Sequence, residues 1–202
     1  MKISYAVTVC NELTEVERLL TQLLAQKHSK DEIVVLYDNK GTEEVLNYLQ
    51  SVEGIKLVCD TFDGHFGDWK NKLTALCTGD FIFQIDADEY LSEEFIDALH
   101  QILEANPEVD LYFIPRINTV SGLTMAHVQK WGWNMWNDRV NWPDRQTRVY
   151  RNNSEIKWEN KVHEKIIGYK QYTTLPAVDE LALIHPKTIE RQEKQNAYYE
   201  TL

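Results

Sequence analysis

The sequence predicts an α/β fold in which helices cover both faces of a mostly parallel sheet. Short apolar runs alternate with helical patterns through the first half of the chain, an order typical of parallel strands joined by crossover helices. Several of these runs are continuously apolar, as strands buried on both faces are. The chain has 202 residues, 43% of them hydrophobic, which suffices for one domain with a sizeable core.

The expected elements alternate regularly as far as residue 115. Apolar and β-branched runs predict strands at 3–10, 32–37, 55–59, 81–85 and 110–115. Helical spacing of apolar residues predicts helices between them, at 12–24, 42–52, 67–77 and 92–106. Ser92 is the expected N-cap of the last of these helices, and Pro107 lies just beyond its end.

The regular alternation stops after residue 115. The next segment is rich in Trp, Asn and Arg, and the remaining expected elements are short strands at 147–151, 161–167 and 181–185 and a helix at 188–202. We therefore divide the domain into a nucleotide-type half, residues 1–118, and an irregular half that shapes a site, residues 119–202.

Composition argues against several classes of protein. The net charge of −11 disfavours a general binder of nucleic acid or acidic membranes, although the segment 139–170 is rich in Lys and Arg. Three widely spaced cysteines indicate reduced thiols and no disulfide framework. No apolar run approaches the roughly 20 residues of a membrane span, and residues 1–10 lack the marks of a signal peptide. We expect a cytoplasmic protein without an integral membrane segment.

The stretch FIFQIDADEYLSEEF, residues 81–95, contains three acids within four positions. Asp86, Asp88 and Glu89 follow an apolar strand directly. Crowded carboxylates repel one another and lose hydration where they are partly buried, so a positive partner is expected beside them. The alternative is a solvated loop that only caps the following helix.

Polar residues also follow the first two strands, where Asn11, Glu12 and Asp38 are found. Ligands of open parallel sheets bind at the carboxyl ends of strands. No glycine-rich phosphate loop follows these strands, so a divalent cation held by the acids is the expected counter-charge for a phosphate-bearing ligand. Two local alternatives exist, because Asp38 could form an Asx turn and Asn11 could cap the first helix.

Four motifs, in this order, resemble glycosyltransferase family 2, which has the GT-A fold. They are VTVCNE, VVLYDN, FGDWKNKLTALCTGDFIFQIDADE and WENKVHEKI, and the D-x-D motif of the family corresponds to Asp86 and Asp88. The resemblance covers residues 3–100 well and 145–200 more loosely, while 116–145 matches nothing. The chain looks like the short stand-alone enzymes of bacteria and tailed phages, which implies a cytoplasmic location (the host cytoplasm for a phage protein).

The resemblance implies metal-dependent, inverting transfer of a sugar from a nucleoside diphosphate, with UDP as the default, to an acceptor hydroxyl. Mn²⁺ or Mg²⁺ would neutralise the departing diphosphate. Asp88 would bind the metal directly, and Asp86 would reach the metal through water or the ribose. His185 would complete the metal shell or contact the diphosphate; the alternative is a turn before Pro186.

The resemblance also implies residues for donor binding and proton transfer. Glu164 would be the catalytic base, with His163 as the second candidate; a salt bridge to Lys161 or Lys165 and a structural histidine are the alternatives. In a strand these two neighbours would face opposite sides. Arg148 and Arg151 are expected on one side of a strand, facing phosphate or acceptor. Donor contacts are expected from Asn11, Glu12, Asp38, Lys70, Asn71, Asp86 and Arg148.

The acceptor is left open between a glycan, a lipid-linked molecule and a hydroxymethylated DNA base. Four tryptophans between residues 131 and 142 would either stack on the acceptor or, as we favour here, pack the core of an irregular subdomain. Two other functions compete with glycosyl transfer. One is a nucleotidyltransferase, which usually has a basic glycine-rich loop that this chain lacks, and the other is a binding module without chemistry.

Overall fold

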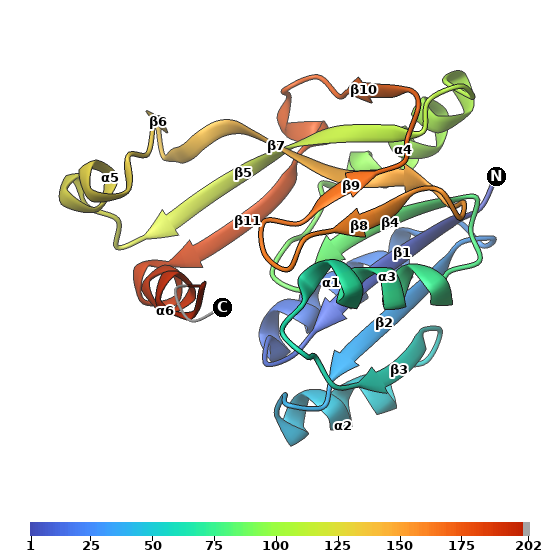
Figure 1. Ribbon diagram of the computed structural model, residues 1–202, viewed down its shortest axis with the longest axis horizontal. Helices are drawn as coiled ribbons and strands as arrows, with labels where there is room; N and C mark the ends of the chain where they lie inside the picture. Colours follow the sequence, from blue (N-terminus) through green and yellow to red (C-terminus); the bar gives the residue numbers. More distant parts are fainter. Residues whose placement is uncertain (200–202) are drawn as a thin grey trace.

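A mixed, mostly parallel sheet of nine strands runs through the computed structural model, which describes residues 1–199 (Figure 1). The strand order is β10-β5-β7-β4-β1-β2-β3, with β11 paired to β5 and β6 paired to β7. The strands of the first half are β1 (Ile3–Val9), β2 (Glu32–Asp38), β3 (Lys56–Asp60) and β4 (Phe81–Asp86). These four strands are parallel to one another, as expected, so their carboxyl ends meet at one edge.

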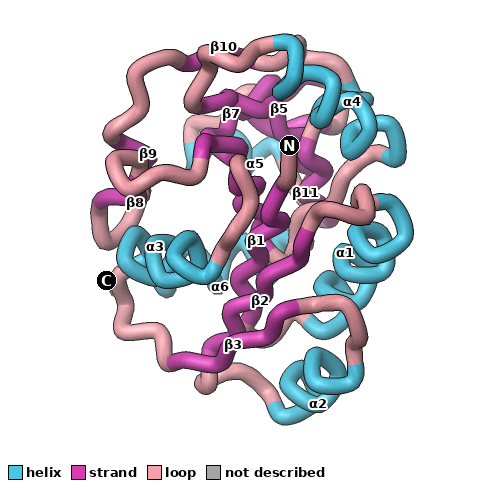
Figure 2. Tube along the Cα trace, turned by 90° about the vertical axis from the view of Figure 1, so that its right-hand side faces the viewer, coloured by secondary structure: helices cyan, strands magenta, loops and turns pink. Residues whose placement is uncertain are grey.

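Helices cover both faces of this sheet, which confirms the predicted class. The helices are α1 (Leu13–Gln26), α2 (Glu43–Ser51), α3 (Phe66–Leu76), α4 (Glu93–Ala105), α5 (Met125–Trp131) and α6 (Ile189–Tyr199), with a 3₁₀ turn at Asp179–Leu181. Helices α1, α2 and α4 lie on one face, and α3 lies on the other (Figure 2). None of the helices within residues 1–199 is both long and apolar enough to cross a bilayer.

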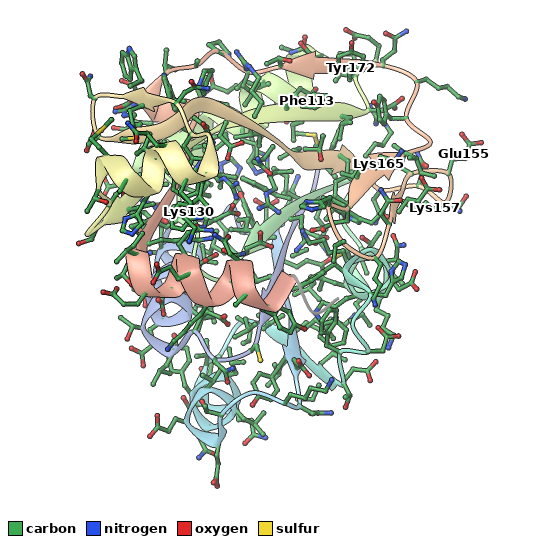
Figure 3. All side chains as sticks on the ribbon, turned by 60° about the vertical axis from the view of Figure 1, so that its left-hand side comes forward. Phe113, Lys130, Glu155, Lys157, Lys165 and Tyr172 are labelled. Carbon is green, nitrogen blue, oxygen red and sulfur yellow. The ribbon has the colours of Figure 1, made fainter. Side chains whose placement is uncertain are left out.

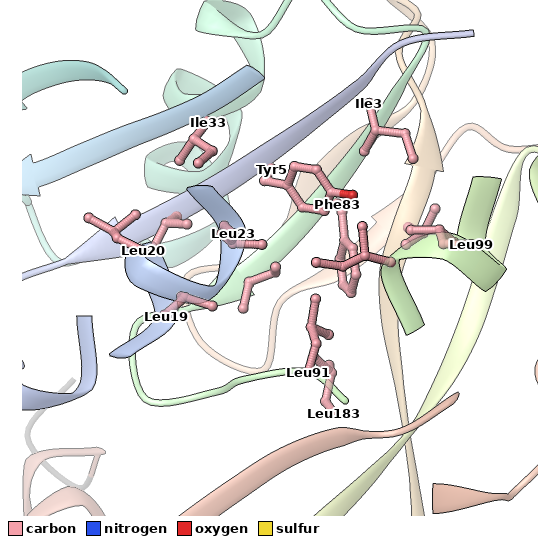
Figure 4. Close-up of a cluster of buried hydrophobic side chains, with 14 of the residues drawn as sticks. Ile3, Tyr5, Leu19, Leu20, Leu23, Ile33, Phe83, Leu91, Leu99 and Leu183 are labelled. Atoms are coloured by element: carbon pink, nitrogen blue, oxygen red, sulfur yellow. The ribbon is translucent and has the colours of Figure 1, made fainter. Parts of the chain in front are cut away.

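Two hydrophobic cores hold these layers together. On the α1 and α4 side, Tyr5 of β1 and Phe83 of β4 are packed in one cluster with Leu23 and Leu99 (Figure 4). On the α3 side, the small β8–β9 sheet covers the helix, and Trp158 of β8 belongs to the second core. Residues of one strand contribute alternately to the two cores because successive side chains point to opposite faces. With both faces buried in this way, the parallel strands β1, β2 and β4 end at the same edge of the sheet.

The second half of the chain is more regular than expected. Its strands are β5 (Leu111–Ser121), β6 (Met135–Trp136), β7 (Arg139–Arg151), β8 (Lys157–Glu159), β9 (Lys165–Ile167), β10 (Tyr172–Thr174) and β11 (Leu183–Thr188). Long antiparallel pairing of β5 with β7, interrupted by two register shifts, replaces the short strands that local sequence predicts. Our division between residues 118 and 119 falls inside β5, so both halves contribute to one sheet.

Three local expectations have different outcomes: the strand at 161–164 is wrong, the alternative cap by Asn11 does not form, and Ser92 is confirmed as an N-cap. The segment 161–164 is not a strand, since His163 has φ 53° and β9 begins only at Lys165. Glu12, not Asn11, is the N-cap of α1. Ser92 is the N-cap of α4, but its hydroxyl donates to the carbonyl of Glu180 instead of capping a helical amide. In each case a long-range contact or a loop decides the conformation.

Candidate active site

The carboxyl ends of β1, β2 and β4 open into a cavity of about 1060 Å³. Segments from the whole length of the chain contribute to its wall, including the second-half strands β5, β7 and β11. Of the residues that the sequence singled out, ten line this cavity: Asn11, Glu12, Asp38, Lys70, Asp86, Asp88, Arg148, His163, Glu164 and His185. The predicted convergence of strand ends is therefore present in the structure.

Asp86, at the end of β4, is surrounded by positive charge. Its Oδ2 accepts a hydrogen bond from Arg148 Nη2 at 2.5 Å, and its Oδ1 lies 3.7 Å from Lys70 Nζ. Burial raises the pKa of Asp86, but the charges of Arg148 and Lys70 outweigh it and hold the pKa well below its usual range. The positive partners expected beside the acids are supplied by the protein itself.

Asp88 is held by a different set of groups. Its Oδ2 lies 3.2 Å from Nε2 of His185 on β11 and 3.4 Å from an Arg191 nitrogen on α6. Burial raises the pKa of Asp88, but the hydrogen bond and charge of His185, with a further contribution from Arg191, bring it to about 2. Asp88 and His185 therefore form a pair facing the cavity, while Asp86 is turned to Arg148 and Lys70.

The orientation of His185 is fixed from behind. Asn118 on β5 donates through its amide nitrogen to Asp144 Oδ2 at 2.8 Å, which turns its Oδ1 toward His185 Nδ1 at 2.7 Å. Because an amide oxygen only accepts, His185 donates from Nδ1. Its Nε2 is thereby directed to Asp88 and the cavity. The carboxylate oxygen is a ligand suited to Mn²⁺ or Mg²⁺, whereas an imidazole nitrogen suits a transition metal and so favours Mn²⁺ of the two.

A second group of potential metal ligands lies elsewhere. Within residues 1–199, the ligand atoms of His28, Asp31 and His100 all lie within 4.8 Å of one another. Asp31 accepts hydrogen bonds from the backbone nitrogen of Ile3 at 2.9 Å and from His100 at 2.8 Å. Ile3 begins β1, so this group is at the amino ends of the strands and does not line the cavity.

Glu164 contacts Lys70, a residue of α3. The Lys70 ammonium donates to Glu164 Oε1 at 2.6 Å and lies 4.5 Å from the centroid of the Trp158 ring. Lys165, considered as a partner for Glu164, pairs instead with Glu159 at 3.8 Å. His163 and Glu164 both line the cavity, since the segment is a loop and the strand rule does not apply to it.

Beneath Asp86 lies a buried ionic network in which Arg116 and Asp144 are members that the sequence did not predict. Glu89 is fully buried, and its Oε1 accepts from Arg148 at 2.7 Å and from Arg116 at 2.9 Å. Its Oε2 accepts from the backbone nitrogen of Asp86 at 3.1 Å. Arg116 also pairs with Asp144 at 2.7 Å. The sequence does contain one indication of this network. Arg116 and Asn118 alternate with an apolar residue and so share one face of β5.

The other strand ends carry polar groups that are partly engaged. Asp38 Oδ1 accepts from the backbone nitrogens of Lys40 and Phe62, both at 3.1 Å, so the alternative Asx turn does form. Its Oδ2 accepts from the thiol of Cys10, whose pKa is raised to about 11 by burial and by the nearby Asp38. Glu12 Oε2 accepts from the backbone nitrogens of Cys10 and Asn11, each at 2.9 Å.

Two predicted contacts to the ligand are not supported by the geometry. Asn71 does not line the cavity, and its amide both donates to and accepts from the backbone of Trp158 at 2.8 Å, which joins α3 to β8. Arg151 does not share a side with Arg148, since residues three apart on a strand face opposite sides. Arg151 instead contacts Asp110 at 3.2 Å and the carbonyl of Pro107 at 2.6 Å.

The sequence matches a family model and several known proteins. The model described as Glycosyl transferase family 2 matches residues 4–176. A glycosyltransferase of Rickettsia bellii is 32% identical over 116 residues, which are 57% of this chain and 37% of that protein. A TPR repeat-containing protein of Synechococcus elongatus is 27% identical over 161 residues, which are 79% of this chain and 35% of that protein. The chain thus spans little more than a third of the length of these relatives.

Solved structures of S. aureus TarS share the fold. The complex of its residues 1–349 with UDP has a TM-score of 0.66 at 19% identity, covering 94% of this chain and 61% of that one. The complex with UDP-GlcNAc has a TM-score of 0.64 at 18% identity, covering 93% and 59%. This likeness confirms the GT-A class of fold that the motifs implied.

Proposed function

The chain belongs to glycosyltransferase family 2, and on this premise we propose that it transfers a sugar from a UDP-sugar to an acceptor hydroxyl, with inversion. One observation carries the proposal: the Asp88–His185 pair and Glu164 line a single cavity at the carboxyl ends of the parallel strands. Parallel sheets bind ligands at this edge. The complexes of TarS with UDP and UDP-GlcNAc support UDP as the nucleotide.

Asp88 and His185 are the residues that would hold Mn²⁺ or Mg²⁺. When bound, the cation neutralises charge on the departing diphosphate. The hydrogen-bond chain from His185 through Asn118 to Asp144 fixes the imidazole for this task. We do not assign Asp86 as a direct ligand of the cation, because Arg148 and Lys70 already neutralise its carboxylate. It would accept hydrogen bonds from the ribose or from a water molecule next to the cation.

Glu164 is the proposed base. Its carboxylate takes the proton of the acceptor hydroxyl while that oxygen bonds to the anomeric carbon, and the bond from this carbon to the diphosphate oxygen breaks with its electron pair on the diphosphate. Attack on the face opposite the leaving group inverts the configuration. The Lys70 ammonium, 2.6 Å from Glu164 Oε1, orients the carboxylate. His163 is the second candidate for this proton transfer.

The nucleotide would lie over the ends of β1 and β2. Asn11 is exposed there, and Asp38 and Glu12 line the same side of the cavity. Asp38 keeps acceptor capacity on Oδ2, which no backbone amide occupies among the described contacts. The base and the ribose hydroxyls are therefore expected to contact Asp38 and Asn11.

The proposal is tested by incubating the protein with a panel of nucleotide sugars and Mn²⁺ and measuring release of nucleoside diphosphate. We expect slow hydrolysis of one UDP-sugar, lost on addition of EDTA. Glu164→Gln should keep donor binding, measured by calorimetry, and lose transfer, whereas His163→Gln should retain most of it. The opposite ranking of the two variants would move the base to His163.

The same experiment separates the competing functions. Release of pyrophosphate from a nucleoside triphosphate would identify a nucleotidyltransferase and overturn the proposal. Saturable binding of a nucleotide sugar with no turnover under any metal would identify a binding module. Turnover that survives complete removal of divalent cations would contradict the role given to Asp88 and His185.

A further inference from the structure

The tryptophan-rich segment lies outside the two main cores and contains three half-buried tryptophans and one exposed tryptophan. We call Trp131, Trp133, Trp136 and Trp142 the aromatic platform. They lie at the end of α5, in the loop that follows it, on β6 and on the first part of β7, and both strands belong to the main sheet (Figure 1). None of the four belongs to either hydrophobic core, and Trp136 is 53% exposed. The tryptophans thus pack against one another outside both main cores, and a cluster of rings that reaches the surface in this way marks a binding site.

The rings of the platform are held in place by their neighbours. The Arg139 guanidinium lies 4.9 Å from the centroid of Trp142 and 5.5 Å from that of Trp136, whose rings are 6.3 Å apart and nearly parallel. Arg139 is itself fixed by two hydrogen bonds to Asp179, at 2.7 and 2.6 Å. Rings that are already ordered lose little conformational entropy when a ligand stacks on them.

The platform reaches the candidate active site through one of its members, Trp133. Trp133 lines the cavity that contains Asp88, His185 and Glu164, together with Val140 and Asn141 of β7. Trp133 in turn contacts Trp131, with ring centroids 4.7 Å apart. A molecule whose end enters the cavity would therefore extend over the tryptophans. Helix α5, which carries Lys130, lies on the same side of the molecule as α6 (Figure 3).

We propose that the aromatic platform binds the acceptor and that this acceptor is an oligosaccharide; the inference rests on the function proposed above. One face of a pyranose ring consists of C–H groups, and an indole face buries it as it would any apolar surface. The hydroxyls at the ring edge need neutral hydrogen-bonding groups. Asn134, Asn137 and Asn141 supply amides next to the tryptophans.

The charges around the platform favour a saccharide over a nucleic acid. A nucleic acid needs several cations for its phosphates. Arg139 is neutralised by Asp179, and Asp138 adds a negative charge. Lys130 lies 5.9 Å from the Trp131 ring, and Lys187 and Arg191 line the same cavity as Trp133. The net charge of −11 disfavours a nucleic acid. A hydroxymethylated DNA base is therefore the less favoured acceptor.

The test measures binding of saccharides without any donor. Tryptophan fluorescence is recorded while the protein is titrated with oligosaccharides of glucose, galactose, mannose and N-acetylglucosamine, and with hydroxymethylated duplex DNA at low salt. We expect saturable binding of one saccharide series, weakened about tenfold in Trp136→Ala and largely kept in Trp136→Phe, which retains a flat ring. Tyr172→Ala is the matched control, because Tyr172 is 61% exposed on β10 and does not line the cavity.

The outcomes separate this inference from the proposed function. Absence of saccharide binding by a protein that still consumes a UDP-sugar would overturn the platform and leave the glycosyltransferase intact. Equal saccharide affinity of wild type and Trp136→Ala would also overturn it, as would salt-sensitive binding of the modified DNA alone. A protein that binds the saccharide but consumes no donor would contradict the proposed function.

Discussion

The two ends of the parallel sheet both carry acidic residues, yet the acids serve different purposes. At the amino ends, Asp31 and Glu32 accept hydrogen bonds from β1, from the loop before β4 and from α4. At the carboxyl ends, Asp86 and Asp88 face a cavity and are neutralised by Arg and His side chains. The carboxylates at the amino ends connect strands and helices by hydrogen bonds. The carboxylates at the carboxyl ends line a cavity in which we expect a ligand to bind.

The difference lies in what each carboxylate contacts. Both oxygens of Asp31 accept hydrogen bonds from backbone amides, those of Ile3 and His28, which need a partner once the protein is folded. At the other end buried charge is packed against buried charge, and Arg148 Nε has no hydrogen-bond partner in the described part of the chain. Buried polar atoms without a partner occur elsewhere in the described residues, Tyr5 Oη among them, so the distinguishing feature of the carboxyl end is that its charges line the cavity.

Replacing Asp88 by Asn should have the largest effect of any change at either end. Removing the charge removes the carboxylate that would hold the cation against the diphosphate, so turnover should fall on the order of 10³-fold or more. Stability should fall, because the lowered pKa of Asp88 means that the folded protein favours its charged form, and His185 and Arg191 lose their partner. Nucleoside diphosphate release and thermal unfolding measure the two effects, and an active variant would remove the metal assignment.

Glu89→Gln tests whether the carboxyl end also contains a structural acid. Glu89 is fully buried and contacts both Arg116 and Arg148. Loss of its charge leaves the two guanidiniums undercompensated, and breaking a buried pair of this kind costs about 3 kcal/mol. Urea unfolding should report the loss. The control is Glu104→Gln at an exposed position of α4; equal stability of the two variants would show that the network contributes nothing to the fold.

Asp31→Asn should lower stability and leave turnover unchanged. The amide oxygen keeps the acceptor for the Ile3 nitrogen, but the amide NH₂ that replaces Oδ2 cannot accept from the backbone nitrogen of His28 or from the His100 ring. Hydrogen bonds to a charged group are worth about 1.5–3 kcal/mol, and we expect a loss in that range by urea unfolding. A loss of turnover with stability intact would abolish the distinction between the two ends.

The same comparison explains what the sequence could and could not predict. The first four strands and the D-x-D motif follow from local patterns, because a continuous apolar run that ends in Asp86 and Asp88 is visible in the sequence itself. The role of Glu89 is not visible there, since its partners Arg116 and Arg148 are 27 and 59 positions away. The β5–β7 ladder was underestimated for the same reason.

Asn71 and Arg151 show a second limit. Both residue types are suited to phosphate or nucleotide contacts, and the family motif includes a position equivalent to Asn71. The side-chain amide of Asn71 is used by the backbone of Trp158, 87 positions away, and Arg151 is used by Asp110. Residue type indicates what a side chain can bind, but only the register of packed elements decides what it does bind.

Glu32 offers the smallest and most specific test, through pH. Burial raises the pKa of Glu32, but hydrogen bonds from Lys2, Ser4 and Thr78 outweigh it and lower the pKa from 4.5 to about 2. The folded state therefore holds the proton less tightly than the unfolded state. The stabilisation is present above pH 4.5 and is lost as the pH falls toward 2, with a slope of at most about 1.4 kcal/mol per pH unit.

Glu32→Gln should remove this part of the pH dependence. Urea unfolding of wild type and variant between about pH 5 and 3 gives the difference in slope, since the other carboxylates titrate equally in both proteins. Turnover near neutral pH should be the same in the two, because Glu32 lies at the amino end of β2, away from the cavity. Parallel stability curves would mean that Glu32 is no better bound in the folded protein than in the unfolded chain, and that acids at the amino ends do not fasten the sheet.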